Sequence, residues 1–246
     1  MLSQDEKWLL NEKYGGAESE AFRADVKRLA CGEPLGYVIG YVPFFGCKIY
    51  LDSHPLIPRV ETEFWVEKAI DAIKGAAPKA PRVLDLCAGS GAIGVAVVRH
   101  VPQAQVTFAE IEKRHLPTIG KNLNENAILC TNYKVFQSDL FSNISGEFDF
   151  ILCNPPYIDA TLNRTEYVVE KYEPHEALYG GRGGLELIEQ IIIAAAPAHL
   201  APQSQLWLEH EPEQSAKVKK LGEQNDFEVT TYKDQYGVER YSILAR

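Results

Sequence analysis

The segment of this chain best suited to chemistry is Asn154-Pro155-Pro156-Tyr157, which directly follows an apolar run at residues 148–153 that is typical of a buried strand. Planar amide or amino nitrogens are poor nucleophiles. An enzyme that alkylates one needs acceptors for its N–H groups and an aromatic face beside its flat substituent. The Asn154 side-chain oxygen and the Pro155 carbonyl can accept the two N–H bonds while Tyr157 stacks on the plane. The pattern predicts a clamp for a planar nitrogen, and an ordinary Pro-Pro turn after a strand is the alternative.

A glycine-rich turn at residues 87–94 lies between a predicted strand and a predicted helix, and its glycines let a ligand approach the backbone closely. Glu110 ends the next strand about 20 residues downstream, where a carboxylate can accept bonds from both ribose hydroxyls of an adenosine-containing cofactor. The alternatives are a turn that serves only helix–strand packing and an idle, solvated acid at a strand end.

The place of the clamp indicates which cofactor this is. Ligands of open α/β sheets bind at the carboxyl ends of the strands, so the clamp faces the crevice above the glycine-rich turn. A dinucleotide enzyme needs a hydride acceptor site and usually a second nucleotide half, and the sequence has no pattern for either. S-adenosylmethionine, with S-adenosylhomocysteine as product, is therefore favoured. Asp139 is expected to accept from the adenine amine and Leu140 to pack on the ring, a helix or turn cap being the alternative for Asp139.

The elements that must position these groups alternate along most of the chain. Strands are expected at residues 82–86, 105–110, 133–137, 148–153, 204–209, 226–233 and 239–245, with helices at 61–75, 91–100, 112–126, 184–196 and 213–222. This alternation predicts an α/β fold with a parallel sheet covered on both faces. The last two strands are too close in sequence for a helical crossover, so they should form an antiparallel hairpin.

The first 60 residues have a different pattern. Helical periodicity at residues 5–14 and 18–31 predicts a small helical appendage, and the aromatic and β-branched residues 37–50 suit a β-hairpin. We expect a small helical N-terminal domain at 1–35, a β-hairpin linker at 36–60 and a Rossmann-like domain at 61–246.

Composition narrows the classes of partner and compartment. The formal charge is -9 and the pI is near 5.2, which argue against extensive nucleic-acid contact. The five cysteines are far apart and form no Cys-x-x-Cys pair, so neither a disulfide framework nor a zinc site is expected. The amino terminus is acidic where a signal peptide would be basic, and no apolar run approaches the roughly 20 residues that span a bilayer. A soluble, cytoplasmic protein with no membrane partner is expected.

Taken together, the motifs resemble the HemK/PrmC family of protein glutamine methyltransferases, which modify the glutamine of the Gly-Gly-Gln motif in class-one translation release factors. The resemblance covers most of the chain through residues 33–40, 56–63, 85–93, 148–158, 172–178 and 208–210. It implies a class I S-adenosylmethionine-dependent methyltransferase fold with a seven-stranded sheet, and a release factor as the protein substrate. By similarity, the glutamine clamp is formed by Asn154, Pro155, Pro156 and Tyr157. The cofactor contacts implied by the resemblance are Cys87, Ala88, Gly89, Ser90, Gly91, Glu110, Leu140 and Asn154. Asp139, which is expected to accept from the adenine amine, completes the predicted cofactor site.

The chain departs from the family pattern in three respects. Cys87 stands where glycine is usual, and Ala88 replaces a hydroxyl residue. Leu140 replaces a frequent aromatic, so less adenine stacking is expected. About 60 residues precede the catalytic domain, fewer than in the family's usual helical appendage, which helps to choose the protein substrate.

Other candidate residues have open interpretations. Arg59, Glu61 and Glu63 form a family signature near the pocket, and the alternative is a capped helix start with solvated charges. His175 and His210 are expected to pack or hydrogen-bond rather than act as bases. The glycine-rich loop at 180–184 suits either a mobile lid or a plain surface loop.

Two rival functions share the same residues. A nucleic-acid adenine methyltransferase would use the same clamp, but it needs cationic tracks for phosphates, and here 25 Lys and Arg stand against 34 Asp and Glu. A catalytically silent binding module would have no chemical need for the combination of Asn154, Tyr157, Gly89, Gly91 and Glu110.

Overall fold

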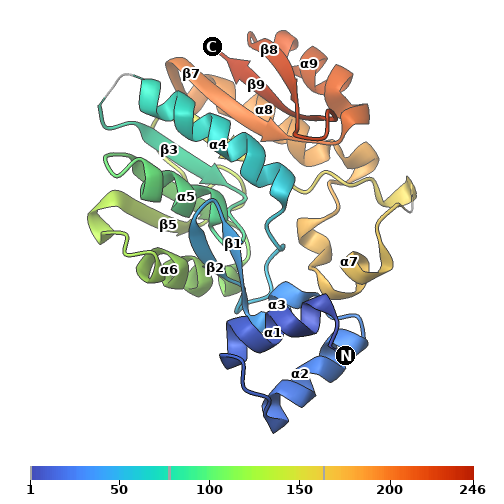
Figure 1. The fold of residues 1–246 in the computed structure, drawn as a ribbon. Helices are drawn as coiled ribbons and strands as arrows, with labels where there is room; N and C mark the ends of the chain where they lie inside the picture. The colour runs from blue at the N-terminus through green and yellow to red at the C-terminus, as the bar shows by residue number, and fades with distance from the viewer. Residues whose placement is uncertain (1, 77–78, 163) are drawn as a thin grey trace.

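The computed structural model describes residues 2–76, 79–162 and 164–246, which form a layered α/β body with a small helical unit at its amino-terminal end (Figure 1). The helices are α1 (Gln4–Tyr14), α2 (Glu20–Ala30), α3 (Leu35–Ile39), α4 (Val60–Gly75), α5 (Ala92–His100), α6 (Leu116–Glu125), α7 (Tyr167–Tyr172), α8 (Glu186–Ala198) and α9 (Ser215–Gln224). The strands are β1 (Tyr41–Phe44), β2 (Cys47–Tyr50), β3 (Arg82–Leu86), β4 (Gln105–Glu110), β5 (Tyr133–Gln137), β6 (Phe148–Cys153), β7 (Leu200–Glu209), β8 (Glu228–Lys233) and β9 (Glu239–Ala245). No helix in these described ranges is both long enough and apolar enough to cross a membrane.

Seven strands form the central sheet in the order β5-β4-β3-β6-β7-β9-β8. The pairs from β5 to β7 are parallel, and β9 runs antiparallel to both β7 and β8, which confirms the predicted final hairpin. From β3 the chain first adds β4 and β5 on one side of the sheet, and then adds β6 and β7 on the other side of β3. Loops that leave the carboxyl ends of these two strands therefore diverge, and the gap between them is where ligands of such sheets bind.

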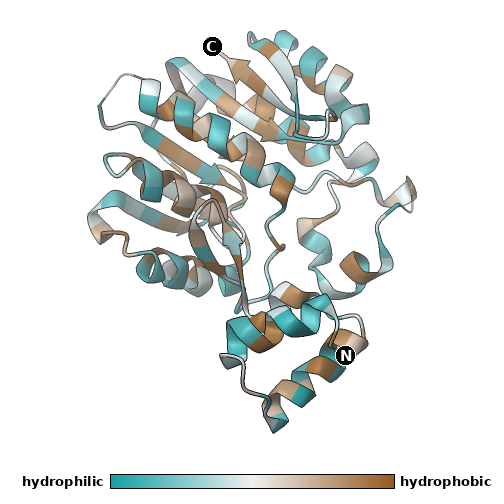
Figure 2. Ribbon diagram, viewed as in Figure 1, coloured by the Kyte–Doolittle hydropathy of each residue, from teal (hydrophilic) through white to brown (hydrophobic). Residues whose placement is uncertain are grey.

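Helices cover both faces of the sheet (Figure 1). Residues of α4, α5 and α6 belong to the hydrophobic core on one face, and residues of α8 and α9 belong to the core on the other. Strand residues alternate between these cores, with Val83 in the first and Leu84 in the second, as the period of a strand requires. In Figure 2 helix α4 alternates between hydrophobic and hydrophilic residues, and its buried positions include Trp65, Val66 and Ile70.

The amino-terminal unit has a small core of its own, which contains Leu9, Phe22 and Val38. Helix α1 begins with a capping box, because Ser3 accepts from the Glu6 N–H and the Glu6 carboxylate accepts from the Ser3 N–H. The appendage helices predicted at 5–14 and 18–31 thus correspond to α1 and α2.

The predicted hairpin begins later than expected. Residues 37–39 form part of α3, and only residues 41–50 make the two strands. Tyr37 and Val38 are buried, and the Tyr37 hydroxyl donates to the Pro55 carbonyl at 2.7 Å, so tertiary packing outweighs their strand preference. The proposed domain divisions at residues 35 and 60 stay predictions.

The remaining differences concern the ends of elements and one missing helix. The helix expected at 112–126 starts at Leu116, after a short 3-10 turn (Lys113–His115), and the strand expected at 204–209 already begins at Leu200. Helix α7 was not predicted at all. It packs near the amino-terminal unit, since the Tyr172 hydroxyl donates to the Cys31 carbonyl at 2.9 Å.

Candidate active site

The glycine-rich turn after β3 depends on left-handed backbone at alternate positions. The φ angles are +59° at Cys87, +55° at Gly89 and +78° at Gly91, which begins α5. A Cβ on Gly89 would meet no atom within 4 Å, whereas one on Gly91 would lie 3.1 Å from Ile119 of α6. Gly91 is therefore needed for helix packing, and Gly89 leaves the backbone open towards a ligand.

Glu110, at the end of β4, holds this turn in place. Its carboxylate accepts the Gly89 N–H at 2.6 Å and the Glu112 N–H at 2.8 Å. Only 6% of Glu110 is exposed, and burial raises its pKa while the backbone donors act in the opposite direction. Each carboxylate oxygen keeps lone-pair capacity for a further donor.

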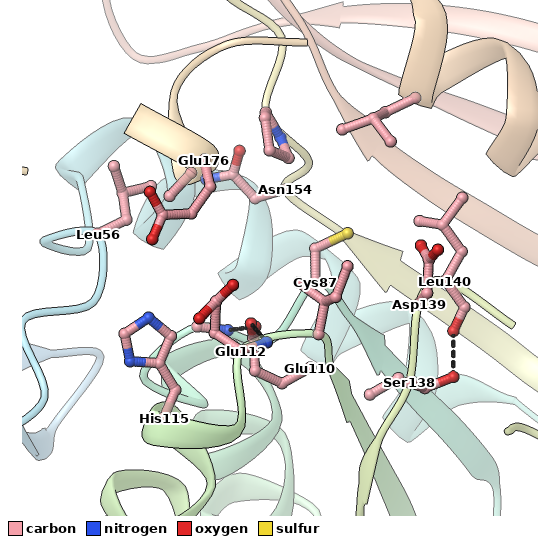
Figure 3. A pocket seen from close by; sticks show the side chains of 16 residues that line it. Leu56, Cys87, Glu110, Glu112, His115, Ser138, Asp139, Leu140, Asn154 and Glu176 are labelled. Carbon is pink, nitrogen blue, oxygen red and sulfur yellow. Dashed lines mark hydrogen bonds between the residues drawn. The ribbon is translucent and has the colours of Figure 1, made fainter. Parts of the chain in front are cut away.

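A cavity of about 190 Å³ opens above the turn and Glu110 (Figure 3). Seven of the predicted site residues line it, namely Cys87, Gly89, Glu110, Asp139, Leu140, Asn154 and Pro156. Ala88, Ser90 and Gly91 belong to the turn but are not among the lining residues of this cavity. The structure thus brings most of the predicted cofactor-binding residues to one cavity, which is formed at the ends of four strands.

Asp139 and Leu140 follow β5 on one wall of this cavity. Leu140 has a φ of +45°, and its carbonyl accepts the Ser138 hydroxyl at 2.7 Å (Figure 3). Asp139 is exposed, and its backbone N–H donates to the Ser142 hydroxyl at 3.2 Å. The hydroxyls of Ser138 and Ser142 therefore cap this turn, and the Asp139 carboxylate is left facing solvent and the cavity.

A second cavity of about 190 Å³ adjoins the first, and Asn154 lies on the wall of both. Pro155 and Tyr157 line the second cavity together with Leu56 and Arg59. Within the described residues, no donor is bonded to the Asn154 side-chain oxygen or to the Pro155 carbonyl. Two residues whose acceptor oxygens have no donor among the described residues therefore line the second cavity, and one of them, Asn154, also lines the first.

The Tyr157 ring is fixed at its hydroxyl end. The hydroxyl donates to the Glu209 carboxylate at 2.9 Å, and burial together with that carboxylate raises the pKa of Tyr157. The Tyr157 carbonyl accepts from the Gln214 side chain at 2.8 Å. The ring is thus held as one wall of the second cavity.

The glycine-rich loop at 180–184 packs directly against the clamp. A Cβ on Gly180 would lie 2.4 Å from the Pro156 carbonyl oxygen, and one on Gly184 would lie 1.9 Å from the Tyr157 carbonyl oxygen. Such close approach of two backbones is possible only without side chains. The two ends of this loop therefore pack on the backbone of the clamp, and its role as a mobile lid stays a prediction.

Comparison with known proteins agrees with this geometry. The family model described as the methyltransferase small domain matches residues 70–172. A release factor glutamine methyltransferase of Xylella fastidiosa is 36% identical over 225 residues, which cover 89% of this chain and 80% of that protein. One of Bordetella pertussis is 34% identical over 251 residues, covering 98% and 90%. The chain belongs to the release factor glutamine methyltransferase family.

Solved structures show the same fold. A 16S rRNA methyltransferase of Thermus thermophilus, in complex with AdoMet and guanosine, superposes with a TM-score of 0.56 at 18% identity, over 83% of this chain and 48% of that one. The class I methyltransferase fold predicted from the sequence is confirmed by the sheet order and by this likeness.

The signature at the start of α4 in this glutamine methyltransferase, formed by Arg59, Glu61 and Glu63, connects separate segments. The Arg59 guanidinium pairs with the Glu173 carboxylate at 2.5 Å, and Glu173 also accepts the Ile57 N–H at 3.1 Å. Glu63 accepts the Phe45 N–H of the β1–β2 turn at 2.8 Å. Arg59 and Glu63 are thus bonded within the protein rather than solvated, and Glu61 is half-buried.

Both histidines behave as expected. His210 is buried, its ring nitrogens lie 2.9 Å from the Glu211 carbonyl and 2.8 Å from the Ser242 hydroxyl, and burial lowers its pKa. The His175 ring bonds the Glu170 carbonyl at 2.9 Å. Sequence reasoning missed Thr62 and Glu209, which the structure connects to the clamp. Both lie inside the segments that carry the family resemblance.

Proposed function

We propose that this chain transfers a methyl group from S-adenosylmethionine to the side-chain amide nitrogen of a glutamine, in the Gly-Gly-Gln motif of a class-one release factor. One observation carries the proposal. The side-chain oxygen of Asn154 and the carbonyl of Pro155 have no donor from the described residues; both residues line the second cavity, and Asn154 also lines the adjoining first cavity. A primary amide has two N–H groups, which match two such acceptors.

The first cavity has the donor and acceptor set that an adenosine-containing sulfonium cofactor requires. The open backbone at Gly89 permits close approach, and Glu110 can accept from the ribose hydroxyls. Leu140 offers an apolar surface for the adenine, and the exposed Asp139 carboxylate can accept from its amine. When bound there, S-adenosylmethionine supplies an electrophilic methyl group on a positively charged sulfur. Asn154 would then lie next to that group.

The clamp residues favour attack by the amide nitrogen. Acceptor bonds from the Asn154 oxygen and the Pro155 carbonyl fix the N–H groups and turn the nitrogen lone pair towards the first cavity. The nitrogen becomes positively charged as its bond to the methyl carbon forms and the bond from that carbon to sulfur breaks, with S-adenosylhomocysteine as the leaving group. Both oxygens stabilise that charge more than they stabilise the neutral amide. The extra proton then leaves to water, so no side chain has to serve as a base. The bonds already made by His175 and His210 agree with this.

The second cavity opens towards a surface that suits a protein substrate. Its lining continues through Thr165, Glu166 and Val169 to α7, which contacts the amino-terminal unit. Large apolar side chains nearby are exposed, with Val60 at 55% and Tyr167 at 73%. Exposed apolar groups around such a cavity are typical of protein-binding surfaces. We expect the substrate loop to lie along α7 with its glutamine in the second cavity.

The experiment combines labelled S-adenosylmethionine with a release factor, a ribosomal protein and a DNA oligomer in separate reactions, and the label is located by mass spectrometry. We expect it on a glutamine of the release factor. Label on DNA adenine would support the adenine methyltransferase instead, and no transfer to any acceptor would support the silent module.

The matched variants are Asn154→Ala and Asn225→Ala. Asn225 lies at the end of α9, away from the clamp, and its side chain donates to the Leu221 carbonyl. Asn154→Ala should lose methyl transfer by at least about 100-fold while cofactor affinity stays within a few-fold, because the lost contacts act in the transition state. Asn225→Ala should keep full activity. Equal turnover by Asn154→Ala and the wild type would refute the clamp.

A further inference from the structure

A buried carboxylate at the end of β7 connects the clamp to helix α4. Glu209 is 1% exposed and accepts three hydrogen bonds. The Thr62 hydroxyl donates at 2.8 Å and the Trp65 indole N–H at 2.6 Å, both to one oxygen, and the Tyr157 hydroxyl donates to the other at 2.9 Å. Since an indole N–H can only donate, that carboxylate oxygen must be an acceptor.

Sheet register explains why Glu209 lies beside the clamp. Cys153 of β6 pairs with Leu208 of β7 in parallel, so Asn154 and Glu209 leave the sheet next to each other. Thr62 and Trp65 lie three residues apart on α4, so both face the same point of the sheet edge. The network is therefore assembled from three elements that are distant in sequence.

The direction of these bonds decides how the Asn154 amide is oriented. The Thr62 hydroxyl has a single proton and gives it to Glu209, so its oxygen can only accept from another group. The Asn154 side-chain nitrogen lies 3.2 Å from that oxygen and donates to it. With the amide reversed, two acceptor oxygens would face each other. The amide oxygen is consequently turned away from Thr62, towards the cavities.

We propose that Thr62 and Glu209 are positioning residues for methyl transfer. Glu209 fixes the hydroxyl of Thr62, Thr62 fixes the amide orientation of Asn154, and the same carboxylate fixes the ring of Tyr157. Both polar side chains of the clamp are thus set by one buried carboxyl group. This inference rests on the proposed function, because it assigns these residues to the reaction at that clamp.

The alternative is that the network only fastens α4 to the sheet. The two interpretations differ in what they predict. A fastening role would change stability, cofactor affinity and substrate KM together. A positioning role changes kcat, because a reversed Asn154 amide presents N–H groups to a substrate that needs an acceptor.

The decisive comparison is between Thr62→Val and Thr62→Ser. Valine keeps the shape of threonine and lacks the hydroxyl, whereas serine keeps the hydroxyl. With a release factor as substrate, we expect Thr62→Val to lower kcat about 10- to 100-fold, with KM and the Kd for S-adenosylmethionine within twofold of wild type. Thr62→Ser should restore kcat to within about threefold. Thr231→Val is the control, because it removes a half-buried hydroxyl on β8 that bonds the Ser242 hydroxyl and no group of the clamp.

Glu209→Gln provides a second measurement that does not depend on Thr62 variants folding. The glutamine oxygen can still accept from Trp65 and Thr62, while its NH₂ group faces the Tyr157 hydroxyl, which can accept instead of donate. Asn154 therefore keeps its orientation, and the loss of kcat should be smaller than in Thr62→Val. A larger loss in Glu209→Gln would contradict the bond directions given above.

The outcomes separate this inference from the proposed function. If wild-type protein does not methylate the release factor, the proposed function fails. If wild type is active and Thr62→Val has a kcat within twofold of it, or Thr62→Ser is as slow as Thr62→Val, the positioning role is wrong. Side-chain amide NMR gives a readout without turnover. The Asn154 NH₂ signals, assigned by their loss in Asn154→Ala, should shift in Thr62→Val and stay near their wild-type positions in Thr62→Ser.

Discussion

The close packing of the glycine-rich loop against the clamp leads to a prediction with a built-in control. In Gly184→Ala the new Cβ would lie 1.9 Å from the Tyr157 carbonyl oxygen and 2.7 Å from its carbon, and both are backbone atoms that cannot rotate away. The residue also has a φ of +66°, where a side chain is strained by about 1–2 kcal/mol. Overpacking adds about 1–3 kcal/mol, so we expect a total loss of about 2–5 kcal/mol.

Gly183→Ala isolates the conformational cost. Gly183 has a φ of +65°, and its Cβ would meet only a Leu185 methyl carbon at 3.9 Å. This variant should lose only the conformational cost of about 1–2 kcal/mol, leaving its melting temperature about 2–12 °C above that of Gly184→Ala. The clash must also displace the Tyr157 backbone, and a shift of about 1 Å at a reacting group can cost about 100-fold in rate.

The assay is thermal unfolding and release-factor methylation of the two variants beside wild type. Gly183→Ala should keep kcat within about twofold, and Gly184→Ala should lose both stability and kcat. Equal melting temperatures and equal kcat values for the two alanine variants would refute the claim that this loop fixes the clamp.

Two further predictions concern the cofactor cavity. In Glu110→Gln, only one of the Gly89 and Glu112 N–H groups keeps an acceptor. The free energy of unfolding should therefore fall by about 1–3 kcal/mol, and calorimetry should show weaker S-adenosylmethionine binding. Unchanged values for both measurements would contradict this role of Glu110. Burial, and to a smaller extent the nearby Arg114, lowers the pKa of His115 from 6.5 to about 4. As pH falls, His115 is therefore protonated in the unfolded chain before it is protonated in the folded protein. The stability that it contributes above pH 6.5 is lost as pH falls towards 4. Urea unfolding at pH 7 and pH 4.5 should therefore show a loss smaller by about 2 kcal/mol in His115→Gln than in wild type, and parallel losses would refute the assignment.

The sheet was predictable because its signals are local. Strands β3 and β6 are buried apolar runs with a clear end, whereas β5 lies at the sheet edge and has no buried residue. The predicted bounds of all four strands from β3 to β6 match the structure. The glycine-rich turn and Glu110 could be paired from spacing alone, since consecutive parallel strands end at the same edge of a sheet. The same rule placed Asn154 near them, and the two acceptors of the clamp follow from residue type.

The network behind the clamp could not be found in this way. Thr62 and Glu209 are 147 residues apart, and the bond between them exists only once α4 has packed beside the end of β7. No periodicity marks such a pair. Residues 37–39 show the opposite failure, because a local strand preference was overruled by burial of Tyr37 and Val38.

The position of α4 depends on contacts made by the residues at its start, which include the family signature. Arg59, which lines the second cavity, pairs with Glu173, Thr62 bonds Glu209 and Asn154, and Glu63 accepts a bond from the β1–β2 turn. The first turn of α4 and the residue before it thus contact the segment that follows α7, the end of β7 and the β1–β2 hairpin. Because these contacts point in different directions, a rotation of α4 would disturb both cavities at once. Arg59 and Glu63 therefore fix the position of α4, and Thr62 connects α4 to the Asn154 side chain.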